Sequence, residues 1–200
     1  MKYQTLSLSL LGTLLGTNLF GGYPATAKPA PIFQPIVREI RDRLPAEFKM
    51  RLPATLPEFT KDLPLFAFVV DDDIKIFGQD VFSVLISDIP GCEEEKDPSE
   101  CTVGVIGVTE ALSEEPLQPE DLPDDSEDLT PVALTNTAQG FYFVQDKQAQ
   151  FVVWEQDELG YLLFSGKCES ECLSKQQMIE IAKSAASEPA ILSADRELVQ

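Results

Sequence analysis

FVVWEQDELGYLLFSGKCESECLSKQQMIEIAKSAA, residues 151–186, is the stretch that decides the fold this sequence predicts. Two runs rich in aromatic and β-branched residues, 149–155 and 160–165, are separated by turn-like residues and indicate a pair of antiparallel strands. A helical pattern follows them after a short loop. The stretch therefore predicts a strand hairpin with a helix packed on it.

The helix is predicted to begin after Ser174, whose side chain suits an N-cap, and Gln177 three positions later completes a capping box. Apolar residues then recur at helical spacing, and such a stripe must bury against an apolar surface. The aromatic residues of the preceding strands could line a ligand pocket, but the helix stripe needs an apolar partner, which favours core packing. The predicted core is Trp154, Tyr161, Phe164, Met178, Ile181 and Ala182.

The rest of the chain predicts further strands of the same sheet. The fold class is therefore α+β, with a single antiparallel sheet of about 6–8 strands in meander order, packed by an N-terminal and a C-terminal helix. The first helix is predicted to begin near Pro35 and to stop at Pro45, followed by a short edge strand at 50–52. Further strands are expected at 65–70, 74–78, 81–89, 102–109, 131–134 and 140–145.

Two glycines lie inside the predicted strand 102–109. Gly104 and Gly107 indicate a bulge or a close approach by another element, because glycine weakens a regular strand.

The first 27 residues predict a cleaved signal peptide. Lys2 precedes an apolar centre, and Ala25 to Ala27 suit the cleavage site. The apolar run is too short and too rich in Gly and Thr to cross a bilayer, so no stable membrane anchor is expected after cleavage. Residues 28–200 are expected to form one domain that is exported to the periplasm or the extracellular space.

The predicted mature chain is strongly acidic, with 14 basic and 34 acidic residues and a net charge of −20. This charge disfavours nucleic acid and anionic lipid as partners. Basic residues are concentrated in 28–61, which holds seven against four acidic ones. This segment either docks electrostatically on the acidic remainder or presents a solvated basic helix face.

Residues 110–130 are predicted to form an acidic, partly disordered loop, since 110–129 contains nine acidic residues, three prolines and no basic residue. A solvated insertion is the favoured interpretation. Weak calcium binding is the functional alternative, because clustered carboxylates suit a hard cation, although the EF-hand pattern is missing.

The four cysteines predict two disulfides in an exported chain. Cys92 lies just after one predicted strand and Cys101 just before the next, so if these strands pair as a hairpin the two residues face each other at the base of its loop. Cys168 and Cys172 would close a smaller loop before the last helix. A zinc site and a redox dithiol are disfavoured, because neither pair has the C-x-x-C spacing.

The sequence contains no histidine and no glycine-rich phosphate loop. This removes Ser-His-Asp and Cys-His machinery and most catalytic zinc sites. We therefore nominate no catalytic, cofactor-binding or metal-binding residues and lean toward a protein without catalytic activity.

Part of the sequence resembles known families. Trp154-Glu155, Tyr161, Phe164 and the helix from Leu173-Ser174 to Ile181-Ala182-Lys183-Ser184 resemble the tail of a family of exported domains of unknown function, some of them linked to anti-sigma-factor proteins. The signal, the acidic mature chain and the Cys92 to Cys101 loop also look like secreted proteins of cyanobacteria. The resemblance implies an antiparallel sheet with a packed terminal helix and brings no catalytic residues.

Three functional hypotheses follow. The first is an exported binding or regulatory module of the periplasm or cell envelope whose partner is a protein or an envelope component. The second is a carboxylate-based hydrolase acting on a glycan, supported only by the abundance of Asp and Glu. The third is a weak calcium-binding module.

The disulfide pairing is testable by proteolysis without reduction followed by mass spectrometry. We expect one pair of peptides joined through Cys92 and Cys101 and another joined through Cys168 and Cys172. Peptides that joined a cysteine of one pair to a cysteine of the other would contradict this pairing.

Overall fold

The structure is a computed structural model, which describes residues 27–57, 64–70, 75–76, 78–95, 101–112, 117–146, 148–166 and 173–194. The predicted signal peptide lies outside the described residues, apart from its last residue. Cys168 and Cys172 also lie outside them.

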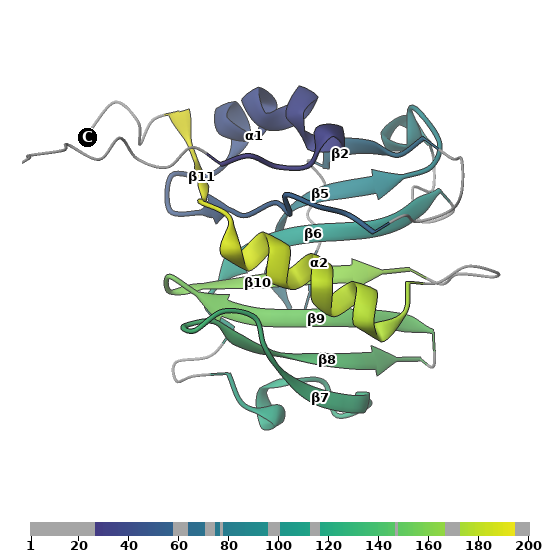
Figure 1. Cartoon of the computed structure of the whole chain (residues 1–200), viewed down its shortest axis with the longest axis vertical. Helices are drawn as coiled ribbons and strands as arrows, with labels where there is room; N and C mark the ends of the chain where they lie inside the picture. Colours follow the sequence, from purple (N-terminus) through teal and green to yellow (C-terminus); the bar gives the residue numbers. More distant parts are fainter. Residues whose placement is uncertain are drawn as a thin grey trace, which may run out of the picture.

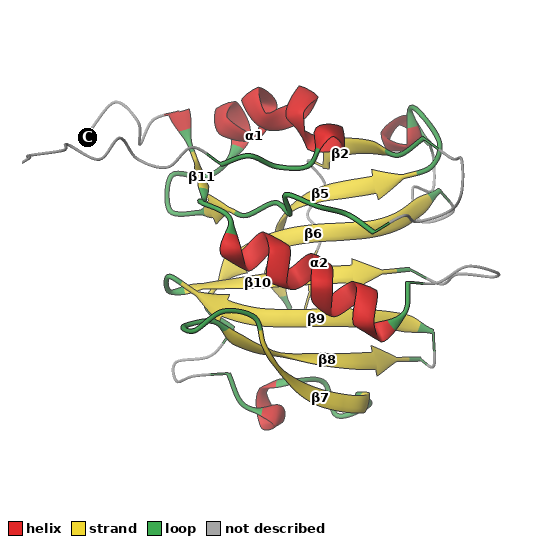
Figure 2. Cartoon of the chain, in the orientation of Figure 1, coloured by secondary structure: helices red, strands yellow, loops and turns green. Residues whose placement is uncertain are grey.

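A seven-stranded sheet forms the centre of the described structure (Figure 2). Its strands are β2 (Phe66–Val70), β5 (Phe82–Ser87), β6 (Thr102–Glu110), β7 (Glu127–Ala133), β8 (Gln139–Gln145), β9 (Ala149–Gln156) and β10 (Leu159–Ser165). The order across the sheet is β2-β5-β6-β10-β9-β8-β7, and every neighbouring pair is antiparallel. Two short antiparallel pairs accompany it, β1 (Lys49–Met50) with β11 (Ile191–Leu192) and β3 (Lys75–Ile76) with β4 (Gln79–Asp80).

The strand order confirms the predicted α+β class with one main antiparallel sheet, but the simple meander is wrong. The sheet consists of two meanders, β2-β5-β6 and β7 to β10, joined where β10 pairs with β6. The chain must therefore pass from β6 in the middle of the sheet to β7 at its edge. Residues 111–126 make this connection, and we call them the crossover segment.

All the longer helical segments lie on one face of the sheet (Figure 1), which we call the helix face. The 3-10 helix η1 (Pro31–Ile36) continues into α1 (Val37–Arg43) near β2, so helical structure begins earlier than the predicted Pro35. The C-terminal helix α2 (Lys175–Ser187) lies over β9 and β10. Two more 3-10 helices are short, η2 (Cys92–Glu94) and η4 (Pro119–Asp121).

Helix α2 begins with the capping box that the sequence predicts. The Ser174 hydroxyl accepts a hydrogen bond from the Gln177 N–H at 3.3 Å, and the Gln177 side chain accepts one from the Ser174 N–H at 2.9 Å. The stripe Met178, Ile181 and Ala182 is at most 1% exposed. These apolar residues belong to the core between the helices and the sheet.

Trp154 and Tyr161 lie beneath α2 in the same core, with stacked rings whose centroids are 5.3 Å apart. Phe164, which the sequence also predicts in this core, lies elsewhere. It packs on the opposite face of the sheet, against the cluster of Phe143, Phe151 and Leu162. Side chains alternate along a strand, so Tyr161 and Phe164, three positions apart, must point to opposite faces.

The N-terminal segment joins the fold mainly through apolar contacts. Buried side chains from η1 to residue 52 belong to the core of the helix face, namely Phe33, Ile36, Ile40, Leu44, Phe48, Met50 and Leu52. The edge strand expected at 50–52 is the two-residue β1, which pairs with β11 near the C-terminus. Two of the basic side chains of α1 pair within the helix, Arg38 with Asp42 and Arg43 with Glu39.

Strand β6 shows both features that its glycines predict. A Cβ on Gly107 would lie 2.5 Å from the Val81 side chain, so another segment does approach closely there. The register between β5 and β6 shifts between Ile86 and Ser87, where β6 is paired near Gly104. Both glycines thus have a local structural role.

The second face of the sheet is covered in part by the crossover segment. Leu122 is buried against Phe143 and Val153, and Leu117 and Leu112 pack on the same cluster. Strand β7 begins at Glu127, inside the stretch predicted to be a loop. The prediction of a solvated insertion is therefore wrong for these leucines, whereas Glu120, Asp121, Asp124 and Asp125 are exposed as expected.

Candidate functional site

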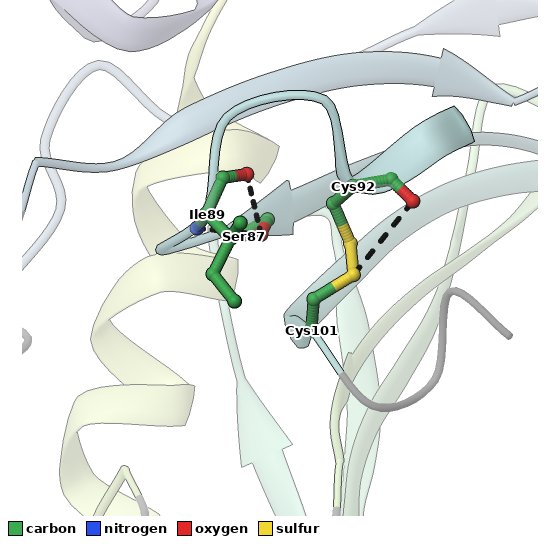
Figure 3. Close-up of a disulfide and its surroundings, with 4 residues drawn as sticks. All are labelled: Ser87, Ile89, Cys92 and Cys101. Atoms are coloured by element: carbon green, nitrogen blue, oxygen red, sulfur yellow. Dashed lines mark hydrogen bonds between the residues drawn. A yellow bond between two sulfur atoms is a disulfide. The ribbon is translucent and has the colours of Figure 1, made fainter. Parts of the chain in front are cut away.

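The Cys92 and Cys101 pair forms the predicted disulfide at the base of the β5–β6 connection (Figure 3), with the two Cα atoms 5.9 Å apart. Both cysteines are buried and pack on Leu85, on the sheet face away from α2. Beside them the Ser87 hydroxyl accepts a hydrogen bond from the Ile89 N–H at 2.9 Å, which fixes the turn that leaves β5. The disulfide lies within a small apolar cluster, so we assign the disulfide a stabilising role.

Polar groups also gather at the C-terminal end of α2, around Arg51. Its guanidinium donates hydrogen bonds to the backbone carbonyls of Ala186 and Glu188, and to the Asp157 carboxylate at 2.7 Å. A cation at this end of a helix is favourable, because unpaired carbonyls concentrate partial negative charge there. Arg51 therefore links the N-terminal segment, the β9–β10 turn and α2, and we call this group the Arg51 junction.

Asp157 and Glu158 form the two-residue turn of the Arg51 junction, with φ of 57° and 65°. Positive φ at both positions is the geometry of a tight hairpin turn whose twist matches that of the strands. The turn holds the Asp157 carboxylate toward Arg51. Non-glycine residues at positive φ are strained, and here the ion pair between Asp157 and Arg51 offsets part of that strain.

Tyr161 completes the Arg51 junction. Its hydroxyl donates a hydrogen bond to the Lys49 carbonyl at 2.8 Å. Burial raises the pKa of Tyr161 to about 12, and the nearby Arg51 opposes this shift only in part. Tyr161 is therefore a neutral, buried side chain whose role is to pack in the core. The contacts of Arg51 and Asp157 likewise hold the fold together, so we assign the junction a structural role and not a functional one.

The N-terminal end of α2 has its own cationic contact. Lys175 donates hydrogen bonds to Asp128 at 3.0 Å and to Thr130 at 2.7 Å, and its ammonium lies 4.8 Å from the centre of the Tyr142 ring. Asp128 has a φ of 52° at the irregular start of β7, which aims its carboxylate at the lysine. Burial, followed by the charge of Asp128, raises the pKa of Tyr142.

A cleft of about 490 Å³ lies between the crossover segment and the hairpin of β7 and β8. Its lining, which defines what we call the crossover cleft, is Leu117, Gln118, Pro131, Val132, Ala133, Thr137, Gln139, Gly140, Phe141 and Glu155. Strand alternation places Pro131, Ala133, Gln139, Phe141 and Glu155 on the face of the sheet away from α2. The cleft is thus part of the second face.

Glu155 fixes the position of the wall of the cleft. Its Oε2 accepts a hydrogen bond from the backbone N–H of Leu117 at 3.2 Å. The aspartate of η4 steadies the same wall, since Asp121 accepts a hydrogen bond from the Gln118 N–H at 2.8 Å. The cleft is open to solvent on one side, and its lining combines apolar side chains with an about equal share of polar surface, including a few oriented polar groups.

The other two functional hypotheses gain no support from the described residues. Among the described lining residues of the cleft, Glu155 is the sole carboxylate, whereas glycoside hydrolysis uses two. No group of three or more Asp, Glu, His or Cys side chains suited to a metal ion occurs within the described ranges.

The sequence predictions place several residues of the crossover cleft on strands but nominate none of them as a binding site. The available signal was the strand alternation, which puts Phe141 and Glu155 on one face, combined with leucines at every fifth position of the crossover segment, 112, 117 and 122. The charge of the segment alone predicts a solvated loop, whereas its leucines predict contact with the sheet.

The described structure thus defines a class of protein, an α+β domain whose antiparallel sheet carries helices on one face and a crossover cleft on the other. Comparisons with known proteins assign it no particular family, because no family model, no curated protein and no solved structure matches this chain. The resemblance of its tail to exported domains and of its other features to cyanobacterial secreted proteins stays a prediction.

The Arg51 junction predicts the stability of an Arg51→Met variant. We expect a loss of about 2–3 kcal/mol, because hydrogen bonds from a charged donor are removed and the Glu188 carbonyl loses that donor, whereas the Ala186 carbonyl still accepts from the Gln156 side chain. Urea denaturation measures the change. Arg38→Met is the matched control, since the Arg38 side chain is 94% exposed. Equal midpoints for the two variants would contradict the assigned role of Arg51.

The raised pKa of Tyr161 predicts a loss of stability at alkaline pH. Between pH 10 and about 12 the unfolded chain has released the phenolic proton and the folded chain still holds it, so the stability falls as the pH rises. We expect a decrease of roughly 2–3 kcal/mol over this range. Denaturation at several pH values measures it, and a Tyr161→Phe variant should show a shallower decrease. Identical slopes would argue against the assignment.

Proposed function

We propose that this chain is an exported, non-catalytic binding module of the periplasm or cell envelope, and that a segment of a partner protein or another envelope component binds in the crossover cleft. The observation that carries the proposal is the cleft itself, which presents apolar side chains and oriented polar groups on the face away from α2. Binding is favoured over catalysis because the described lining provides one carboxylate and no histidine.

Two observations are compatible with export. The Cys92 and Cys101 disulfide is typical of proteins that pass through an oxidising compartment. None of the helices in the described ranges is long and apolar enough to span a membrane. The proposed location rests on the predicted signal peptide, with which the disulfide is compatible.

The proposal predicts a ligand whose binding depends on the crossover cleft. Ala133 is exposed in the cleft, so an Ala133→Trp variant should fill it, whereas Lys183→Trp places the same side chain on the exposed side of α2. Molecules captured from a solubilised envelope fraction are identified by mass spectrometry and then titrated individually. We expect at least one to bind the wild type and Lys183→Trp at least tenfold more tightly than Ala133→Trp.

Equal melting temperatures would show that both tryptophan variants fold like the wild type. The proposal is refuted if every captured molecule binds the three folded proteins with the same affinity.

A further inference from the structure

We propose that the crossover cleft selects a peptide segment that carries an arginine or lysine side chain next to an apolar residue. This inference rests on the proposed function, since it names the ligand of the same site. Three features of the cleft support it: its carboxylate, its aromatic floor and the charge of the chain around it.

The carboxylate is that of Glu155, which projects from β9 on the second face of the sheet. Its contact with the Leu117 N–H at 3.2 Å gives it a fixed position in the wall. Because a charged carboxylate held in place needs no reorientation to meet a cation, it can form a charge-assisted hydrogen bond with a guanidinium or ammonium group.

The aromatic floor is Phe141. Phe141 pairs with Val153 and Gln139 pairs with Glu155, so Phe141 and Glu155 are diagonal neighbours on one face of β8 and β9. Diagonal neighbours lie about 7–8 Å apart, within reach of long side chains. A cation placed between them contacts the carboxylate and the face of the ring, which is also favourable.

The part of the chain that supplies the lining is acidic. Its described residues between 101 and 166 include eleven acidic side chains and no basic one. Clefts with walls of one sign focus the field and attract ligands of opposite charge. The described lining includes no Lys or Arg.

The edge of the sheet favours recognition through side chains. Pro131 of the edge strand β7 has no N–H to donate, which weakens the addition of a further strand there. The amide of Gln139 can instead bond the peptide backbone, while Leu117 and Phe141 contact an apolar side chain. A volume of about 490 Å³ suits one basic side chain and its immediate neighbours.

Calorimetric titrations with acetylated, amidated tripeptides test this inference. The peptides have leucine on either side of a central arginine, citrulline or glutamate, and citrulline keeps the shape of arginine without its charge. We expect the wild type to bind the arginine peptide at least tenfold more tightly than the citrulline peptide, and the glutamate peptide most weakly. Raising the salt concentration should reduce the preference.

Two variants separate charge from shape. Glu155→Gln keeps an acceptor for the Leu117 N–H and removes the charge, so it should bind the arginine and citrulline peptides about equally. Glu180→Gln removes one charge from the exposed side of α2 and should keep the preference. Ala133→Trp should bind none of the peptides.

The outcomes also separate this inference from the proposed function. If arginine and citrulline peptides bind the wild type equally and Ala133→Trp binds neither, the cleft is a binding site but the charge selection is wrong. If no peptide binds while an envelope component shows cleft-dependent binding, the basic peptide is the wrong ligand and the proposed function stands. If neither binds in the cleft, both proposals fail.

Discussion

The hydrogen bonds of Arg51 hold together three parts of the chain that are far apart in the sequence. The guanidinium, contributed by the N-terminal segment, bonds the last carbonyls of α2 and the Asp157 carboxylate in the turn between β9 and β10. Each partner alone is a modest contact. Together they fix the direction in which α2 leaves the sheet, because a helix end that is tied to both of its neighbours has little freedom to tilt. The stripe of α2 can then cover Trp154 and Tyr161, and the N-terminal segment closes the remaining edge of the core.

The crossover segment covers part of the second face of the sheet with apolar side chains, as the helices cover the helix face. It has to pass from β6 to β7 over the strands between them. Its leucines pack on the sheet, while the carboxylates of Glu120, Asp121, Asp124 and Asp125 are exposed. This division explains how one segment can be strongly acidic and still be packed. It also explains why the cleft exists. The wall at Leu117 and the hairpin of β7 and β8 approach each other without complete contact, and Glu155 holds the wall at that position.

Much of the fold follows from local patterns, whereas the site follows from long-range pairing. Ser174 and Gln177 mark the start of α2 in the sequence, and the cysteines at 92 and 101 mark the ends of a hairpin, because both signals depend on neighbours in the chain. The face on which Phe164 lies was also predictable, since alternation from Tyr161 settles it. β10 pairs with β6, and β1 pairs with β11, although these strands are far apart in the sequence. No pattern within any one of these strands indicates which other strand it pairs with. The cleft depends on the first of these pairings, so the sequence patterns could not place Leu117 beside Glu155.

The pairing of β1 with β11 has a consequence for the order of folding events. Arg51 meets Ala186 across 135 positions of sequence, and the adjoining strands join segments that are equally remote. Contacts of such long range form late, because closing a large loop costs entropy before any contact compensates for it. The apolar side chains of the N-terminal segment therefore remain without their final cover until residues 186–192 are present. A chain that emerges progressively, from a ribosome or through a membrane pore, cannot complete this core before these residues have emerged.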